Sequence, residues 1–502
     1  MSRARAGGAA SGGREGAAPG WRPCPVAAAA AEAPTRTALT FGGATWTWAE
    51  LDAMVASWSR HLADRGLREG EPLAVLSYNR PEFLFALFGA ARLGAWVVPL
   101  NARLSAAELR PLLERVSPRL VLVDPPLAPQ LEGVAAQVER LDVALAPGLS
   151  PRYAGWLADG PLLGLFTSGT AGRPKLAVQG ILQFEAASRA SAARLGGSLP
   201  VWLGTLPLFH VGGMAMVFRV LFDRGALVLS ARFDPGEAND AFDRAGITHA
   251  SLVPTTLARL LEAREGRRFS PDVRAVLIGG GPMSPALLES ARALGLPCLQ
   301  TYGMTEACSQ LTTEEPALAD GTTAGPPLDG TRLRIVDDRG RALPTGAEGR
   351  IEVRGPTLFQ GYHGDPAATS EAWEGGWFAT GDLGVLDARG RLRLLSRRTD
   401  LIVRGGENVY PAELEHLIAS HPDVEEAAVV GLADATWGQL PVALVVLRRP
   451  LSAAELDAFV RGRLARFKWP ARWVAVQALP RNAMGKLERG RLQELASGPP
   501  LA

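Results

Sequence analysis

The sequence predicts an α/β protein with a large N-terminal domain of parallel α/β sheets, a small β-rich subdomain, and a small α+β C-terminal domain. Three observations support this prediction. Strand-like apolar runs alternate with helical patterns from Thr37 onward, short alternating strands follow after about residue 325, and a compact mixture of helices and strands begins near residue 400. A chain of 502 residues also exceeds the usual size of one core, so we expect two or three domains.

The N-terminal part has the pattern of a parallel sheet. Its first apolar strand, 71–79, is followed by a helical pattern at 80–94 in which Pro81 stands near the helix start. A strand, a capped helix and a third strand come next, at 95–101, 105–116 and 119–124. Strands separated by helices imply right-handed crossovers and parallel pairing. Further strands of this kind are predicted at 225–230, 247–254 and 273–281.

The pattern of the last third is different. Residues 332–355 read as short alternating strands with turn signals, which predicts antiparallel pairing. Two helices are then predicted at 411–421 and 452–465, and two strands between them at 424–434 and 441–449. We place a domain boundary between Arg397 and Thr399, which divides the chain into domains of residues 35–398 and 399–502.

Composition excludes several classes of protein. The net charge of +2 gives no reason to expect a nucleic-acid partner. Cys24, Cys298 and Cys308 are too few for a disulfide framework, so we expect a reducing compartment, the cytoplasm. No apolar run is long enough to span a membrane. Residues 1–34 are rich in Ala, Gly and Arg, and we expect either a disordered leader or a mis-annotated start.

The segment TSGTAGRPK, residues 167–175, has the composition of a phosphate-binding loop. Its hydroxyls and glycine backbone N–H groups can approach an oxyanion closely, and Lys175 adds a mobile positive charge. It is not a Walker loop, because only two residues separate Gly169 from Gly172 and Pro174 precedes the lysine. The alternative, a surface turn of small residues, stays open on this segment alone.

Five segments, in order along the chain, together resemble the adenylate-forming superfamily of acyl- and aryl-CoA ligases. They are TSGTAGRPK at 167–175, TYGMTEACSQ at 301–310, GWFATGDLG at 376–384, SRRTDLIVRGGENVYPAELE at 396–415 and LPRNAMGK at 479–486. The resemblance extends from about residue 37 to the end of the chain. It implies ATP, Mg²⁺ and CoA as cofactor and co-substrates, and a small-molecule carboxylic acid as the substrate.

The resemblance assigns nucleotide contacts to several of these residues. The β- and γ-phosphates would be held by Thr167, Ser168, Gly169, Thr170, Gly172 and Lys175. In the segment that includes Gly303, Tyr302 would stack on adenine, Thr305 would contact the α-phosphate, and Glu306 would hold Mg²⁺, for which a hard carboxylate ligand is suitable.

Further residues would bind the ribose and carry out the reaction. Asp382 would accept hydrogen bonds from both ribose hydroxyls, and Arg397, or its neighbour Arg398, would reach the ribose or a phosphate. Lys486 would be the catalytic lysine between the attacking carboxylate and the α-phosphate. Thr399 occupies the position of the family hinge, about which the small domain would rotate between two half-reactions.

The acid and thiol channels would be bordered by a third group of residues. His210 occupies a position where the family has an aromatic residue or a histidine between the two channels, and we assign it a positioning role. After the rotation, Gly405 and Gly406 would line the CoA tunnel; a plain hairpin turn is the alternative reading. The floor of the acid pocket would be formed by Gly279, Gly280 and Gly281.

Within the superfamily, the segments are most similar to the o-succinylbenzoate–CoA ligases of menaquinone biosynthesis. That substrate has a second carboxylate, and Arg219, the lone charge in MAMVFRVLF, could bind it; pairing with a protein carboxylate is the alternative. Other readings are a ligase for another aryl or acyl acid, or a carrier-protein-loading enzyme, although no carrier-like segment follows Lys486. The sequence lacks the glycine motif of a Rossmann oxidoreductase after its first strand, and a non-catalytic nucleotide binder would be expected to lose Lys486 or Glu306, which are both present. The sequence leaves the oligomeric state open, a homo-oligomer included.

Overall fold

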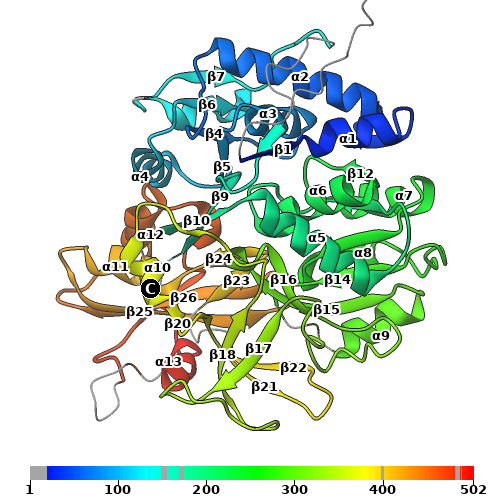
Figure 1. Ribbon diagram of the computed structural model, residues 1–502. Coiled ribbons are helices and arrows are strands. Elements are labelled where there is room, and N and C mark those ends of the chain that lie inside the picture. Colours follow the sequence, from blue (N-terminus) through cyan, green and yellow to red (C-terminus); the bar gives the residue numbers. More distant parts are fainter. Residues whose placement is uncertain are drawn as a thin grey trace, which may run out of the picture.

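The computed structural model describes residues 20–501 except 135, 148–154, 169–173, 282, 284, 397–400, 481–486 and 488. The described residues form five β-sheets (Figure 1). Two large sheets and a smaller antiparallel sheet lie in the larger part of the chain, and a separate sheet with three helices forms a small C-terminal unit. The expected α/β class, with a large N-terminal part and a small C-terminal part, is confirmed.

The first large sheet has the strand order β19-β10-β9-β5-β4-β6-β7. Its strands are β4 (Pro72–Leu76), β5 (Trp96–Leu100), β6 (Leu120–Val123), β7 (Val138–Arg140), β9 (Leu163–Ser168), β10 (Pro174–Gln179) and β19 (Gly361–Tyr362). Helix α3 (Pro81–Arg92) joins β4 to β5, which pair in parallel, and helix α4 (Ala106–Val116) joins β5 to β6, which both pair in parallel with β4, in line with the predicted strand–helix–strand pattern.

The second large sheet has the order β16-β15-β14-β13-β11-β12-β2-β3. Its strands are β2 (Thr37–Phe41), β3 (Ala44–Thr47), β11 (Val201–Gly204), β12 (Ala226–Leu229), β13 (His249–Leu252), β14 (Ala275–Ile278), β15 (Cys298–Met304) and β16 (Ser309–Thr313). The interior strands are parallel, and β3 and β16 are antiparallel edge strands. Its helices are α5 (Ile181–Leu195), α6 (Val211–Asp223), α7 (Pro235–Arg244), α8 (Pro254–Glu262) and α9 (Pro285–Ala293).

The main hydrophobic core lies between these two sheets. One buried cluster joins side chains of both sheets to helices α2 (Trp48–Asp64), α3, α5 and α6. Phe184 of α5 stacks on Phe218 of α6 with 4.1 Å between ring centroids, and Phe88 of α3 meets Phe218 edge-on. Because α3 is buried around most of its circumference, its sequence is almost entirely apolar.

The predicted antiparallel region is also confirmed. It consists of β17 (Arg332–Val336), β18 (Gly349–Arg354), β20 (Trp373–Glu374), β21 (Trp377–Leu386) and β22 (Leu392–Ser396), with helix α10 (Pro366–Glu371) beside it. Every pairing within this sheet is antiparallel. The first part of strand β21 borders the large cavity described below, and this brings Asp382 to that cavity.

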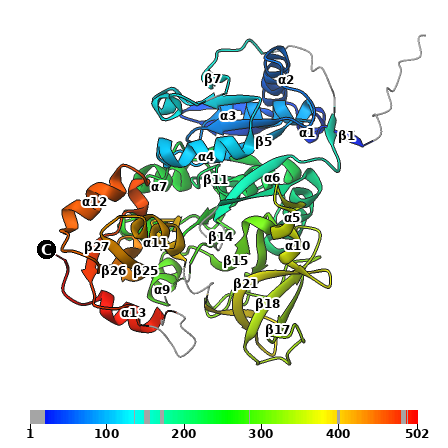
Figure 2. The ribbon, with the colours of Figure 1, turned by 90° about the vertical axis from the view of Figure 1, so that its left-hand side faces the viewer.

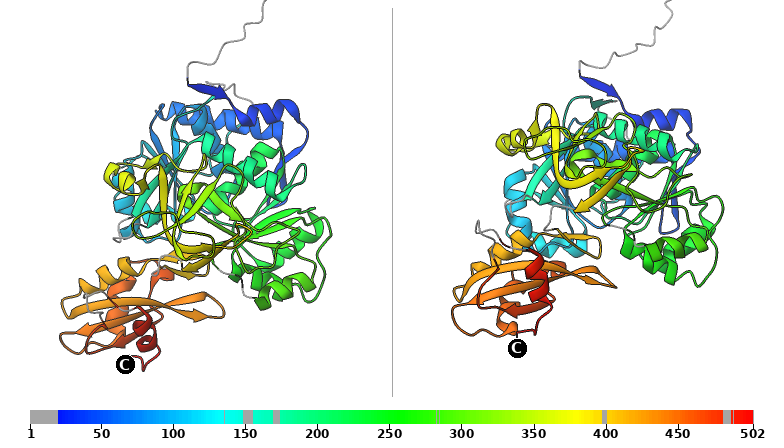
Figure 3. Two further views of the ribbon diagram at one scale, coloured as in Figure 1. Left: turned by 60° about the horizontal axis from the view of Figure 1, so that its bottom comes forward. Right: turned by 90° about the horizontal axis from the view of Figure 1, so that it is seen from below.

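The small C-terminal unit has its own sheet, in the order β24-β23-β26-β25 with β27 paired to β26. Its elements are β23 (Ile402–Arg404), β24 (Glu407–Val409), α11 (Pro411–Ala419), β25 (Val424–Asp434), β26 (Gly438–Leu447), α12 (Ala453–Arg461), a 3₁₀ turn (Arg466–Lys468), β27 (Arg472–Ala475) and α13 (Arg489–Ala496). Two buried clusters fill the two faces of this sheet. Figure 2 and Figure 3 show the unit, coloured orange to red, at one corner of the molecule.

The beginning of the described chain corrects one expectation. Residues 20–34 are part of the fold, because β1 (Trp21–Pro23) pairs with β8 (Gly155–Leu157) and α1 (Pro25–Glu32) follows it. Cys24, Val26 and Ala29 are buried in the main core. An alanine-rich segment is a good helix former, and its small side chains allow close packing. Of the expected leader, residues 1–19 lie outside the described part of the chain.

Two further points concern the whole molecule. The expected boundary at Arg397–Thr399 lies outside the described residues; β22 ends at Ser396 and β23 begins at Ile402. Among the described helices, none combines the length and apolar character needed to cross a bilayer.

Candidate active site

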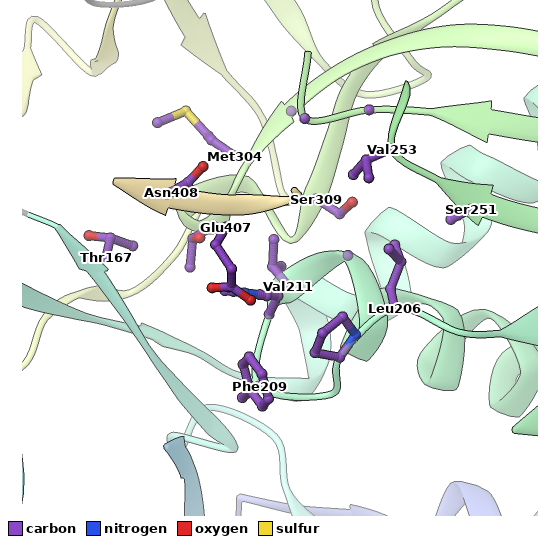
Figure 4. Close-up of a pocket in the computed structure, with 18 of the residues that line it drawn as sticks. Thr167, Leu206, Phe209, Val211, Ser251, Val253, Met304, Ser309, Glu407 and Asn408 are labelled. Atoms are coloured by element: carbon purple, nitrogen blue, oxygen red, sulfur yellow. The ribbon is translucent and has the colours of Figure 1, made fainter. Parts of the chain in front are cut away.

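A cavity of about 1590 Å³ lies where the two large sheets, the β-rich sheet and the small C-terminal unit meet. Figure 4 shows part of its wall, with Thr167, Met304, Ser309 and Glu407 around one space. It brings together most of the described residues that the sequence singled out. Among its lining residues are Thr167, Lys175, His210, Gly279, Gly280, Gly303, Thr305, Glu306, Asp382, Gly405 and Gly406.

One end of the cavity combines a buried carboxylate with a lysine. Lys175 on β10 lies directly opposite Thr167 on β9, so both stand at the base of the hairpin whose tip is outside the described residues. Glu306 is 7% exposed and accepts a hydrogen bond of 2.8 Å from the Tyr362 hydroxyl. The Lys175 ammonium lies 4.8 Å from the centre of the Tyr362 ring. Burial raises the pKa of Glu306, opposed by hydrogen bonds, including that from Tyr362, and by the charge of Lys175.

A second region lies along the first part of β21. The Tyr302 hydroxyl donates a 2.6 Å hydrogen bond to the Asp382 carboxylate. Tyr302 is 2% exposed, belongs to the core cluster that includes Phe378, and is not among the cavity-lining residues. Tyr302 therefore holds the Asp382 carboxylate through its hydroxyl, from the side away from the cavity. The expected stacking of Tyr302 on adenine stays a prediction. Next to it, Gly303 permits a close approach of β16, since a Cβ there would lie 1.4 Å from the Ser309 carbonyl oxygen.

The third region is lined by small residues after β14. Gly280 has a φ of +77° and, like Gly279, faces the cavity, while Gly281 is not among the lining residues. The Gly281 carbonyl instead accepts a hydrogen bond from the Gln300 side chain. Of the three glycines expected at the floor of the acid pocket, two line the cavity, and their role toward the acid stays a prediction.

Arg219 stands one residue behind the cavity wall. Its side chain is 3% exposed, and it donates a 2.6 Å hydrogen bond to the Gln310 side-chain oxygen. Gln310 lines the cavity and Arg219 does not. Burial lowers the pKa of Arg219 to about 10, opposed by the charge of Asp223 one turn along α6. The structure thus corrects the expected direct contact between Arg219 and a substrate: the group that faces the cavity is Gln310.

The small C-terminal unit closes the cavity through Glu407. This side chain is almost fully buried, and one of its oxygens lies 3.2 Å from the His210 ring nitrogen Nε2. It also accepts hydrogen bonds from Asn101, at 3.0 Å, and Arg103, at 2.6 Å. Burial alone would raise the pKa of Glu407, but His210, Arg103 and Asn101 lower it to about 2.

The two glycines before Glu407 form the turn between β23 and β24. Gly405 has a φ of +58° and Gly406 a φ of +86°, and both face the cavity. Gly406 comes close to the other side of the cavity, because a Cβ there would lie 3.4 Å from a methyl group of Val253. The same segment therefore forms a hairpin turn and lines the cavity, and its place in a CoA tunnel stays a prediction.

Two family descriptions match this chain. Residues 26–363 match the family described as AMP-binding enzyme, and residues 413–486 match the AMP-binding enzyme C-terminal domain. The chain belongs to the AMP-binding enzyme family. A curated relative of this AMP-binding enzyme is the 2-succinylbenzoate–CoA ligase of Geobacillus kaustophilus, which is 40% identical over 475 residues, covering 92% of this chain and 95% of the relative.

Two solved structures of one relative differ in their similarity to this AMP-binding enzyme. A doubly substituted o-succinylbenzoate–CoA synthetase of Bacillus subtilis, bound with its product analogue, has a TM-score of 0.90 at 35% identity and covers 96% of this chain and 100% of its own. The complex of the Bacillus subtilis enzyme with ATP and magnesium has a TM-score of 0.73 at 36% identity, covering 94% and 100%. Of these two structures, the one with the product analogue therefore has the arrangement more similar to that of this chain.

Some predicted site residues of this AMP-binding enzyme lie outside the described part of the chain, and some residues of the cavity were not predicted from the sequence. Gly169, Thr170, Gly172, Arg397, Thr399 and Lys486 lie outside the described residues, and of Ser168 only its place at the end of β9 is described. Tyr362, Gln310, Asn101, Arg103 and Glu407 were not predicted, although all line or border the cavity. Gln310 belongs to the family-like segment 301–310 and Glu407 to the segment 396–415. Only their long-range contacts distinguish these two residues from their neighbours in the sequence.

Proposed function

We propose that this chain is an ATP-dependent acid–CoA ligase that converts o-succinylbenzoate to o-succinylbenzoyl-CoA, with release of AMP and pyrophosphate, in menaquinone biosynthesis. One observation carries the proposal. A single cavity combines Glu306 and Lys175, the Asp382 carboxylate, a glycine-lined pocket and the turn of the small C-terminal unit, in a chain that aligns over nearly the full length of 2-succinylbenzoate–CoA ligases.

The first half-reaction joins the acid to AMP. A carboxylate oxygen of the acid attacks the α-phosphorus of ATP, the bond to the bridging oxygen breaks, and pyrophosphate leaves with the electron pair. No general base is needed, because the acid is already ionised at neutral pH. In this proposal Lys486 bridges the two reacting groups, Thr305 contacts the α-phosphate, and Asp382 accepts hydrogen bonds from the ribose hydroxyls.

The residues at the phosphate end are suitable for a magnesium ion. Glu306 is buried, lines the cavity and is ordered by Tyr362, which is appropriate for one carboxylate ligand in a site completed by phosphates and water. When bound, the ion would neutralise phosphate charge. Lys175 and Thr167 would hold the terminal phosphates, together with Ser168, Gly169, Thr170 and Gly172.

The second half-reaction transfers the acyl group to CoA. The CoA sulfur attacks the carbonyl carbon of the adenylate, the bond to AMP breaks, and the thiol proton is released. The turn of Gly405 and Gly406 would border the entering thiol, and His210 is a positioning residue between the channels. The proposed hinge is Thr399, and Arg397 would contact the ribose or a phosphate.

The proposal is tested by supplying ATP, Mg²⁺ and CoA with a panel of acids that includes o-succinylbenzoate, benzoate, a cinnamate and short fatty acids. AMP release and the mass of the acyl-CoA are measured. We expect o-succinylbenzoyl-CoA as the main product. Thioester from another acid instead would contradict the assigned substrate, and adenylate without thioester would point to a carrier protein as the acceptor.

A further inference from the structure

A second charged cluster joins the small C-terminal unit to the rest of the molecule. The Lys468 ammonium, in the 3₁₀ turn Arg466–Lys468, donates hydrogen bonds of 2.6 Å to Glu108 of α4 and 2.7 Å to Glu413 of α11. The side chains of Lys468 and Glu108 are each 9% exposed. Glu413 belongs to the same unit as Lys468, so the Lys468–Glu108 contact is the one that crosses between the two units.

Glu108 is held in place on its own side of the contact. Its second carboxylate oxygen accepts hydrogen bonds from the backbone N–H of Ser105, at 2.9 Å, and from the Ser105 hydroxyl, at 2.7 Å. This is the capping box of helix α4. The Ser105 hydroxyl lies 3.4 Å from the carbonyl oxygen of Arg463 in the small unit. The carboxylate therefore has one defined position from which it can meet Lys468.

Burial makes this contact sensitive to orientation. An ion pair excluded from water is favourable only at close range and good geometry, and separating it leaves charges that must be hydrated again. Rotation of the small unit would separate Glu108 from Lys468 but would leave Glu413 beside Lys468. The cluster therefore stabilises one orientation of the small unit more than another. An ion pair inside either unit would not do so, because its two partners move together.

Both cross-unit clusters use one short segment of the large part. Asn101 and Arg103 bind Glu407, and Glu108 binds Lys468, so residues 101–108 receive both (Figure 1 shows α4 beside α12). The Glu407 cluster borders the cavity, whereas Lys468 and its two partners are not among the cavity-lining residues. The Lys468 cluster thus has no direct access to a substrate and can act only through position.

We propose that the Lys468–Glu108 contact, with Glu413 placing the lysine, is an ionic lock that selects the orientation of the small unit used for thioester formation. This inference rests on the proposed function, because it requires two half-reactions in one cavity. The assignment of the orientation is supported by the TM-score of 0.90 with the product-analogue complex, against 0.73 with the ATP and magnesium complex. Lys468, Glu108 and Glu413 are positioning residues.

The test separates the two half-reactions in Glu108→Gln. The amide removes the charge but can still accept the Ser105 cap, so helix α4 is retained. Adenylation is measured by exchange of labelled pyrophosphate into ATP, and thioester formation by single-turnover reaction of supplied acyl-adenylate with CoA. We expect thioester formation to slow about tenfold and the KM for CoA to rise, whereas adenylation stays equal or becomes faster.

Two further variants accompany Glu108→Gln. Glu413→Gln removes the partner that places Lys468 but leaves the cross-unit pair, so thioester formation is expected to slow by less than in Glu108→Gln, while adenylation stays within about twofold of wild type. Glu114→Gln changes an exposed residue of the same helix α4 and is expected to change neither.

Each outcome decides the proposal. An unchanged ratio of the two rates in Glu108→Gln would contradict it, and so would equal loss of both with a lower melting temperature, which indicates a purely structural role. A wild-type protein that performs neither half-reaction would instead overturn the proposed function, and the inference with it.

A distance measurement supplies an independent readout. Spin labels at Arg110→Cys and Ala454→Cys, both exposed positions, report the separation of α4 and α12 by pulsed electron paramagnetic resonance, and the three native cysteines are buried. One main distance is expected with Glu108 present and a second population with Glu108→Gln. Identical distributions would contradict the lock.

Discussion

Buried polar residues lie along the part of the cavity where we propose that the acid binds. Gln310 is 3% exposed, accepts a hydrogen bond from Arg219 and donates one of 2.7 Å to the Thr313 hydroxyl. With both ends of its amide engaged, Gln310 has little freedom to rotate. Arg219 lies over the Trp202 ring, 5.1 Å from its centre. The guanidinium therefore acts on the cavity through the position of Gln310.

Two substitutions test this arrangement. Arg219→Met and Gln310→Met are each expected to raise the KM for the acid about tenfold with little change in the KM for ATP, because either removes the same hydrogen-bonded unit. The double variant is expected to be no worse than either single variant. Steady-state kinetics with each substrate varied in turn measures this. Multiplicative effects, or an equal rise for ATP, would show that the residues act separately.

His249 introduces a pH dependence of stability. Burial lowers the pKa of His249 to about 4, and the positive charges of Arg274 and Arg219 add to this effect. The unfolded chain takes up a proton near the ordinary pKa of about 6.5, but the folded chain does not, so stability falls as the pH decreases through this interval.

This loss of stability at lower pH can be measured by comparing the wild type with a variant that lacks the imidazole ring. Between pH 7.5 and pH 5, the wild type is expected to lose about 2 kcal/mol more free energy of unfolding than His249→Gln, which lacks the titrating ring. Urea unfolding followed by circular dichroism at both pH values provides the comparison. Parallel losses in the two proteins would show that His249 is not the group responsible.

At the scale of elements, the site is built at strand ends and tight hairpins. Thr167 and Lys175 face each other across β9 and β10, and β15 is joined to β16 through the turn that contains Glu306. The pairing of β15 with β16 is irregular between Tyr302 and Gly303. A bulge of this kind redirects side chains at the end of a sheet, which brings Glu306 and Gln310 to the same cavity.

Gly303→Ala is expected to disrupt this turn. A Cβ would lie 1.4 Å from the Ser309 carbonyl oxygen, so β15 and β16 must separate locally. We expect a loss of about 2 kcal/mol or more in stability and weaker ATP binding, measured by thermal unfolding and calorimetry. Gly462→Ala is the matched control, because a Cβ at Gly462 meets nothing within 4 Å. Equal melting temperatures for both variants would contradict this reading of the turn.

At the scale of the whole molecule, the arrangement of the two units determines the cavity. The small unit contributes Gly405, Gly406 and Glu407 to a cavity whose other walls come from three different sheets. Its contacts with the large part include two buried charge clusters. The energy of such a contact depends more sharply on the position of the small unit than the energy of an apolar contact does. A fold of this kind is suited to discrete orientations of the small unit.

The three cysteines provide a test of the packing of the whole chain. All three are buried, and burial raises the pKa of the Cys298 thiol to about 12 and that of Cys308 well above its usual range. Because the thiolate is the reactive form, we expect no rapid reaction with a disulfide reagent in the folded protein and three reactive thiols per chain in denaturant. Rapid labelling of any thiol before unfolding would contradict the described core.

Much of the fold followed from local pattern. The structure has its elements where they were predicted: parallel strands with crossover helices in residues 71–124, antiparallel strands in 332–355 and an α+β unit after residue 400. Apolar periodicity over ten to fifteen residues reflects which face of an element is buried, and it needs no knowledge of the partner. The same local reading failed for residues 21–32, because small alanines give little apolar signal although they pack in the core.

What the sequence by itself determined was the order of elements and the short segments that line the cavity, since both are encoded in neighbouring residues. Only the tertiary structure decided that Tyr362 bonds Glu306, that Gln310 rather than Arg219 faces the cavity, and that Glu407 and Lys468 reach residues 101–108. Each of these contacts joins residues 56 or more positions apart. Such contacts depend on how sheets and units pack, and no local pattern contains that information.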